Sequence, residues 1–125
     1  METHAIARNA YAHQAQATRT PRETEYEAFA RITRRLSGAA EEGQAGFASL
    51  AGALHDNRSL WTTLAVDVAD PGNALPEALR ARIFYLAQFT SQHSDKILAG
   101  EADVEPLVFI NTTIMRGLRR EGAVA

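Results

Sequence analysis

The sequence contains no cysteine, and this absence excludes disulfide bonds, thiolate metal ligands and cysteine nucleophiles. It also has no apolar run close to the roughly 18 residues that cross a bilayer. Its N-terminus, METHAIA, lacks the hydrophobic stretch of a secretory signal. Basic residues are not in excess, because the net charge is −2, and this argues against a general nucleic-acid binder. We therefore expect one cytoplasmic domain that spans residues 1–125.

The sequence does contain apolar residues at helical spacing. Four segments carry them: one that begins at Thr20 and Pro21, one from about residue 45 to 69 whose stripe includes Phe47 and Trp61, one that Pro76 opens and Gly100 closes, and one that begins at 103–106. Turn residues separate these segments, and no stretch alternates with the period of a strand. The predicted fold class is all-α, an antiparallel bundle of four main helices with a lightly packed N-terminal helix.

The two ends of the chain are expected to differ from the four main helices. Residues 1–19 are rich in Ala and Gln, which favour a helix, but Ile6 and Tyr11 are their only large apolar residues. We interpret this segment as a helix that packs lightly on the rest, and the alternative is a mobile segment that docks when a partner arrives. The tail at 121–125 is expected to fray.

Residues with catalytic or metal-binding chemistry do not occur at productive spacings. The four histidines, His4, His13, His55 and His93, form no pair that would place two ligands on one helical face. No phosphate-binding loop, calcium loop or nucleophile elbow is found. We therefore expect no enzyme activity, no cofactor and no metal, and we interpret His93 as a hydrogen-bonded residue in the core or at its boundary.

Polar residues beside apolar stripes are more informative. Asn57 and Arg58 flank the stripe that carries Trp61, and Asn111 lies on the stripe of the last helix. A buried amide needs hydrogen-bond partners, so Asn57 and Asn111 are expected to satisfy each other or nearby backbone and to fix the register of the helices. The alternative is that Asn57 and Arg58 line a groove that binds a partner. Trp61 is expected in the core, with a place in that groove as its alternative.

Five further residues are candidates for a partner-facing surface, namely Arg31, Arg34, Arg35, Phe84 and Phe109. The three arginines form either a solvated helix face or a basic patch for an acidic partner. The two phenylalanines lie off the apolar stripes of their helices. They are either single exposed apolar side chains, which are common, or parts of an interaction surface.

Several motifs occur together in an order that is typical of one family. They are AYA at 10–12, TPRETEY at 20–26 with Phe29, DNR at 56–58 with LW at 60–61, DPGNALPEALR at 70–80, and DVEPL at 103–107 with Ile110 and Asn111. With these motifs, the chain resembles the FlaF family of flagellar biosynthesis regulators of alphaproteobacteria, over nearly its whole length. The resemblance implies a protein that promotes flagellin synthesis and secretion and binds flagellin as a chaperone. It also implies action opposite to FlbT, a repressor associated with flagellin messenger RNA.

Three functions follow from these observations. The leading hypothesis is a non-enzymatic, cytoplasmic chaperone and regulator whose partner is flagellin. The second is a post-transcriptional regulator that acts on flagellin messenger RNA directly or through FlbT; the three arginines motivate it, while the net charge of −2 disfavours direct RNA binding. The third is a structural adaptor or homodimer that uses Phe84 or Phe109 as its interface. No membrane or DNA partner is expected.

Overall fold

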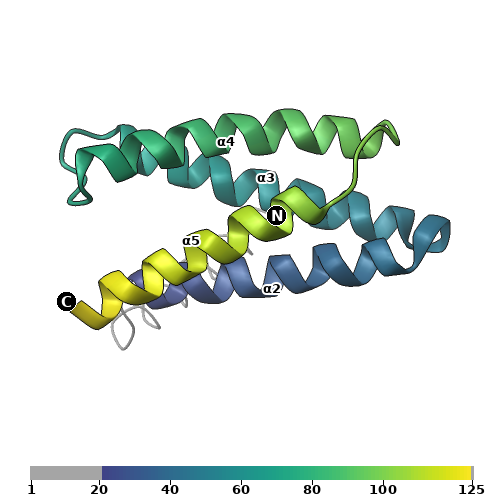
Figure 1. Ribbon diagram of the computed structural model, residues 1–125, viewed down its shortest axis with the longest axis horizontal. Coiled ribbons are helices and arrows are strands. Elements are labelled where there is room, and N and C mark those ends of the chain that lie inside the picture. Colours follow the sequence, from purple (N-terminus) through teal and green to yellow (C-terminus); the bar gives the residue numbers. More distant parts are fainter. Residues whose placement is uncertain (1–20, 125) are drawn as a thin grey trace, which may run out of the picture.

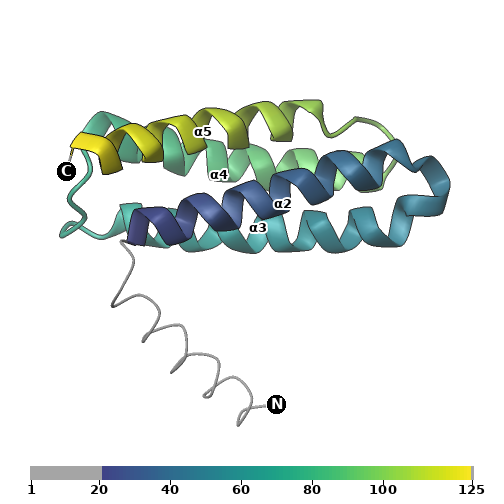
Figure 2. The same ribbon diagram turned by 90° about the horizontal axis from the view of Figure 1, so that it is seen from below.

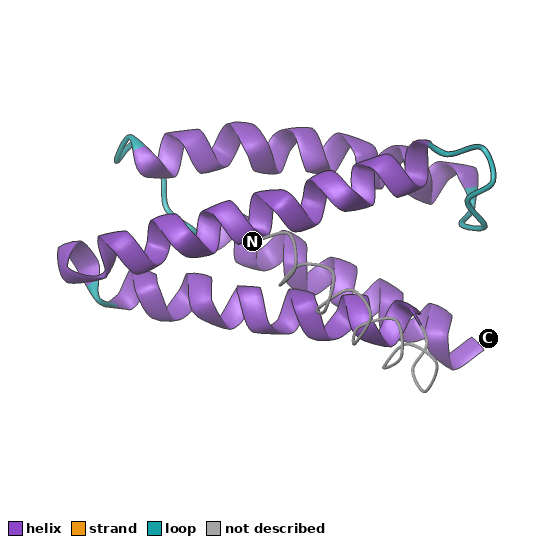
Figure 3. Cartoon of the chain, turned by 180° about the vertical axis from the view of Figure 1, so that it is seen from behind, coloured by secondary structure: helices purple, strands orange, loops and turns teal. Residues whose placement is uncertain are grey.

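The computed structural model describes the backbone of residues 21–124 and the side chains of residues 26–117. This part of the chain consists of helices and connecting loops, without a strand (Figure 3). The helices are α2 (Pro21–Glu41), α3 (Phe47–Ala69), α4 (Glu77–Leu98) and α5 (Glu105–Val124), and a 3₁₀ turn, η1 (Gly43–Gly46), separates α2 from α3. The all-α prediction is confirmed for these residues. The helix predicted at residues 1–19 lies outside them, and fraying of the tail at 121–125 stays a prediction.

The four helices extend along one long axis (Figures 1 and 2). In Figure 1 the chain runs from left to right along α2, back along α3, out again along α4 and back along α5. Helix α2 packs against both α3 and α5, and α3 also packs against α4, whereas α4 touches α5 only slightly. Helix α3 is therefore the main attachment of α4 to the rest of the described chain.

Two helix ends follow the predicted local chemistry. Helix α2 begins at Pro21, and proline is common at the first helical position. Helix α4 ends where Gly100 adopts a φ of 76°. There the amides of Gly100 and Glu101 donate to the carbonyls of Ile97 and Lys96 at 3.0 and 2.8 Å, which is a Schellman motif.

The loop between α3 and α4 is held by its own polar side chains. The Asp70 carboxylate accepts the N–H of Gly72 at 2.9 Å, and the Asn73 side chain accepts the N–H of Leu75 at 3.0 Å and donates to the Asp67 carbonyl at 3.1 Å. Asp and Asn favour turns because they bond to nearby backbone in this way. The predicted turn at 70–73 is confirmed, and it determines where α4 begins relative to the end of α3.

The start of α3 differs from the prediction. The sequence predicts a helix from about residue 45, but the 3₁₀ turn occupies Gly43–Gly46 and α3 begins at Phe47. Gly43 has a φ of 62°, and a Cβ on Gly46 would lie 2.5 Å from the Ala39 carbonyl oxygen, so both positions require glycine. Phe47, at the first position of the helix, is 53% exposed, so its predicted place on the buried stripe is wrong.

The core consists of two apolar clusters with polar side chains between them. One cluster contains Phe29, Trp61, Leu64, Val68, Ile83 and Ile114, and the other contains Ile32, Leu36, Ala53, Leu54, Ile97, Val104 and Leu107. Between the clusters lie five buried polar residues, which we call the polar layer: Thr33, Asn57, Thr90, Ser94 and Asn111. Each of the four helices contributes to both clusters and to the polar layer.

Candidate functional site

Asn111 is the centre of the polar layer. Its Oδ1 accepts the Trp61 indole N–H at 2.9 Å, and its Nδ2 donates to Asn57 Oδ1 at 2.8 Å and to the Thr33 hydroxyl at 3.1 Å. The Thr33 hydroxyl donates in turn to the Phe29 carbonyl at 2.6 Å. One side chain of α5 is thereby bonded to both α2 and α3. A shift of any of these helices by one turn would break the network, so it specifies their register.

The network confirms that Asn57 and Asn111 bond to each other. Asn57 is 0% exposed and Trp61 is 1% exposed, and the Trp61 ring meets the Phe29 ring edge to face with 5.6 Å between centroids. Trp61 is therefore a core residue, as predicted. The alternative in which Asn57 contacts a partner does not fit this fold, because its side chain does not reach the surface.

Two atoms of the polar layer have no hydrogen-bond partner within the described residues. They are Asn57 Nδ2 and Thr90 Oγ1. The other threonines with described side chains each donate the hydroxyl to the carbonyl four residues earlier, and Thr90 does not; those threonines are Thr33, Thr62, Thr63, Thr112 and Thr113. A buried polar group without a partner costs about 1–3 kcal/mol. The polar layer is therefore less stable than it would be if these two atoms had hydrogen-bond partners.

Arg58 connects α3 to α4. Its Nη2 donates to the Ser91 carbonyl at 2.8 Å and to the Asp95 carboxylate at 2.6 Å. Consecutive residues of a helix point about 100° apart, so Asn57 faces α5 while Arg58 reaches α4. Arg58 thus organises the helices, and it is also partly exposed on the surface that α3 and α4 share.

Arg80 makes the reciprocal connection from α4 to α3. Its Nε donates to the Val68 carbonyl at 2.8 Å and its Nη2 donates to the Asp70 carbonyl at 3.0 Å. These carbonyls lie at the C-terminal end of α3, where the helix dipole and the unpaired carbonyls favour a cation. We call Arg58 and Arg80 the arginine ties. Sequence reasoning did not identify Arg80, because its partners belong to another helix.

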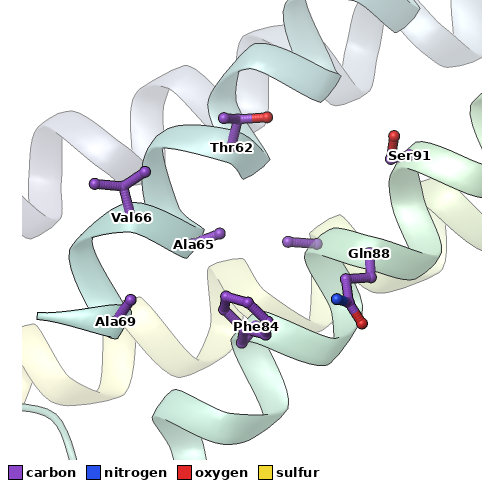
Figure 4. Close-up of a pocket in the computed structure, with 8 residues that line it drawn as sticks. Thr62, Ala65, Val66, Ala69, Phe84, Gln88 and Ser91 are labelled. Atoms are coloured by element: carbon purple, nitrogen blue, oxygen red, sulfur yellow. The ribbon is translucent and has the colours of Figure 1, made fainter.

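Between the arginine ties, α3 and α4 form an apolar groove of about 320 Å³ on the surface (Figure 4). Its walls are Thr62, Ala65, Val66 and Ala69 from α3 and Phe84, Ala87, Gln88 and Ser91 from α4. A second hollow shares Ala69 and Phe84 with this groove and extends it towards Glu77 and Arg80. In Figure 4 the Phe84 ring projects from α4 towards Ala65 and Ala69. The fold therefore brings two predicted site residues, Arg58 and Phe84, to the same face.

The other predicted partner-binding residues lie outside this groove. Arg31 and Arg34 are exposed on α2, and Arg35 forms an ion pair with Asp56 of α3 at 2.5 Å. Phe109 is 64% exposed on α5. None of these side chains is among those that line the groove or the second hollow. Their partner-binding roles stay predictions.

The histidine and acidic side chains bear on metal binding and on contacts with the core. Among them, no group of three or more His, Asp or Glu side chains is placed to hold a metal ion. His93 lies at the edge of the core, where its Nε2 is 2.9 Å from the Asp103 carbonyl oxygen and its ring stacks on Phe89 with 5.3 Å between centroids. This placement confirms the structural interpretation of His93. None of the described helices is both long and apolar enough to span a membrane.

These features define a small all-helical protein with a polar layer inside and an apolar groove on its surface. The sequence model of the family described as flagellar protein FlaF matches residues 7–118. The chain therefore belongs to the FlaF family of flagellar proteins, which confirms the resemblance seen in its motifs. Comparisons with curated proteins and with solved structures gave no match.

Proposed function

We propose that this protein promotes flagellin synthesis and secretion by binding unassembled flagellin in the cytoplasm as a chaperone, without catalysing a reaction. The family match carries the proposal. Because it covers residues 7–118, it includes α2, α3, α4 and most of α5, together with the groove and both arginine ties. The flagellar association thus belongs to the whole fold and not to one short motif.

The fold supports a binding role on physical grounds. We infer that the four helices form one antiparallel bundle whose register the polar layer maintains, so that surface side chains of α3 and α4 keep constant relative positions. Exposed apolar side chains on such a scaffold suit the recognition of an amphipathic segment. Unassembled flagellin offers segments of this kind, and covering them would prevent premature association.

Isothermal titration calorimetry with monomeric flagellin tests this proposal. We expect the full-length protein to bind with a dissociation constant of about 1 μM or tighter, which corresponds to about −8 kcal/mol. The same flagellin after polymerisation serves as the control, and it should bind more weakly because filament contacts occupy its apolar segments. Absence of binding at concentrations of about 50 μM would reject direct chaperoning.

Action on flagellin messenger RNA, directly or through FlbT, is a second candidate function, and the exposed arginines Arg31 and Arg34 on α2 favour it. A pull-down with flagellin, FlbT and flagellin messenger RNA as baits compares the candidates directly. RNA binding that does not weaken from low to physiological salt would contradict phosphate recognition. Light scattering that shows a monomer at every concentration would exclude the third candidate, a homodimeric adaptor.

A further inference from the structure

We propose that the groove between α3 and α4 is a docking site for one amphipathic α-helix of about three turns with a Lys or Arg at one end. This inference rests on the proposed function, because a segment of flagellin is the expected source of the helix. The apolar surface of the groove has a shape that the protein's own polar side chains maintain. Four features of the groove restrict what can occupy it: its lining, the arginine ties, its length and its charge.

The groove is apolar although it lies on the surface. Val66 is 67% exposed and Phe84 is 45% exposed, and only alanines, Ala65, Ala69 and Ala87, complete the apolar part of its lining. The small alanine side chains leave room between the two larger ones. Contiguous exposed apolar surface of this kind marks interaction sites in soluble proteins. The lining therefore fits the apolar side chains of a partner.

The arginine ties hold the two walls of the groove in position. Arg58 reaches from α3 to α4 at one end, and Arg80 reaches from α4 to the last turn of α3 at the other. Both bond to main-chain carbonyls, so they hold helix against helix and not only side chain against side chain. A surface that is already ordered before binding loses little conformational entropy when a partner docks, which favours affinity.

The distance between the ties sets the length of the occupant. Ser91, whose carbonyl accepts from Arg58, follows Arg80 by 11 residues on α4. With a rise of about 1.5 Å per residue, these positions are roughly 16 Å apart. A helix of about three turns has this length, and it presents apolar side chains at i, i+3, i+4 and i+7, as helices that bind in grooves do.

The charges around the groove specify the chemistry of the occupant. Asp95 neutralises Arg58, and main-chain carbonyls engage Arg80. Glu77 lines the second hollow and forms no ion pair within the described residues. The complement of this surface is an apolar helix face with a Lys or Arg at the Glu77 end.

Calorimetry with monomeric flagellin and two matched phenylalanine variants tests the docking site. Phe84→Ala removes a wall of the groove, whereas Phe109→Ala removes an exposed ring from α5. We expect Phe84→Ala to weaken binding by about ten-fold or more and Phe109→Ala to leave it unchanged. Ala69→Arg places a bulky cation in both hollows at the end of α3, where the helix dipole tolerates it, and it should abolish detectable binding. Glu77→Lys should weaken binding by about five-fold.

The possible outcomes distinguish a failure of the docking-site proposal from a failure of the proposed function. If the unmodified protein does not bind flagellin, both proposals are rejected. If it binds and the Phe84→Ala and Ala69→Arg variants bind equally well, the docking site is rejected and the proposed function stands. A loss limited to Phe109→Ala would place the interface on α5 and also reject the docking site. A dimer that Ala69→Arg converts to a monomer would reject the helix in favour of a second copy. Circular dichroism melts check each fold, and Val66→Asp replaces any variant that does not fold.

Discussion

Replacing Thr90 with valine should stabilise the protein, although it removes a hydroxyl from the polar layer. Thr90 is 0% exposed, and its hydroxyl has no partner within the described residues. The folded state therefore bears the cost of an unpaired buried hydroxyl, about 1–3 kcal/mol. Valine has nearly the same shape, so most of this cost should be recovered. We expect a gain of about 1–2 kcal/mol in the free energy of unfolding, or about 4–8 °C in Tm for a domain of this size.

Urea unfolding followed by tryptophan fluorescence measures the effect, because Trp61 is the only tryptophan and it is buried. Thr33→Val is the matched control. The Thr33 hydroxyl accepts from Asn111 Nδ2 and donates to the Phe29 carbonyl, so this variant should lose about 1–2 kcal/mol. The two identical substitutions should thus change stability in opposite directions. A lower urea midpoint for Thr90→Val would refute the reasoning, because it would mean that the Thr90 hydroxyl is paired.

Three further predictions concern the core and the turn before α3. Trp61→Ala should lower the free energy of unfolding by about 3–5 kcal/mol. Urea unfolding followed by circular dichroism measures it, because this variant has no tryptophan, and a midpoint near that of the unmodified protein would contradict the core placement of Trp61. Asn111→Ala leaves the Trp61 N–H and the Asn57 side-chain Oδ1 unpaired, so the free energy of unfolding in urea should fall by about 3–5 kcal/mol. A fall of less than about 1 kcal/mol would show that the network is redundant. Gly46→Ala should cost about 1–3 kcal/mol because the new Cβ would lie 2.5 Å from the Ala39 carbonyl oxygen. Gly38→Ala is the matched control, because a Cβ there would meet nothing within 4 Å apart from its chain neighbours and the backbone of its own helix. It should raise the free energy of unfolding by about 0.5–1 kcal/mol, and thermal melts of the two variants that shift in the same direction would contradict this account.

The helix ends were predictable where they depend on a few neighbouring residues. Pro21, Gly100 and the turn at 70–73 each supply the required backbone angle or bond within their own segment. The start of α3 was not predictable in this way. It depends on how closely Gly46 approaches the carbonyl of Ala39, and residue spacing does not reveal such a contact.

The interior of the site was predictable only in part. An asparagine on an apolar stripe must find partners, so the pairing of Asn57 with Asn111 could be anticipated. Thr33 and Thr90 look alike in the sequence, yet one hydroxyl is paired and the other is not within the described residues. Helical periodicity shows which face a residue occupies and not which helix lies opposite. Periodicity therefore predicts that Phe84 lies off the apolar stripe of its helix, but it does not predict that α3 forms the opposite wall of the groove.

The polar layer and the groove are linked through two adjacent residues of α3. Asn57 bonds to Asn111 of α5, and Arg58 bonds to α4, so one dipeptide positions α3 against two neighbours at once. Asn57 Nδ2 is unpaired within the described residues, so an apolar residue at position 57 would remove the free-energy cost of that buried atom. It would also remove the hydrogen bond to Asn111 that distinguishes one helix register from the next. A slip of α3 by one turn, about 5.4 Å, would move Val66 away from Phe84 and abolish the groove. The shape of the groove therefore depends on a polar layer whose hydrogen bonds fix the register of the helices, although its two unpaired atoms reduce stability.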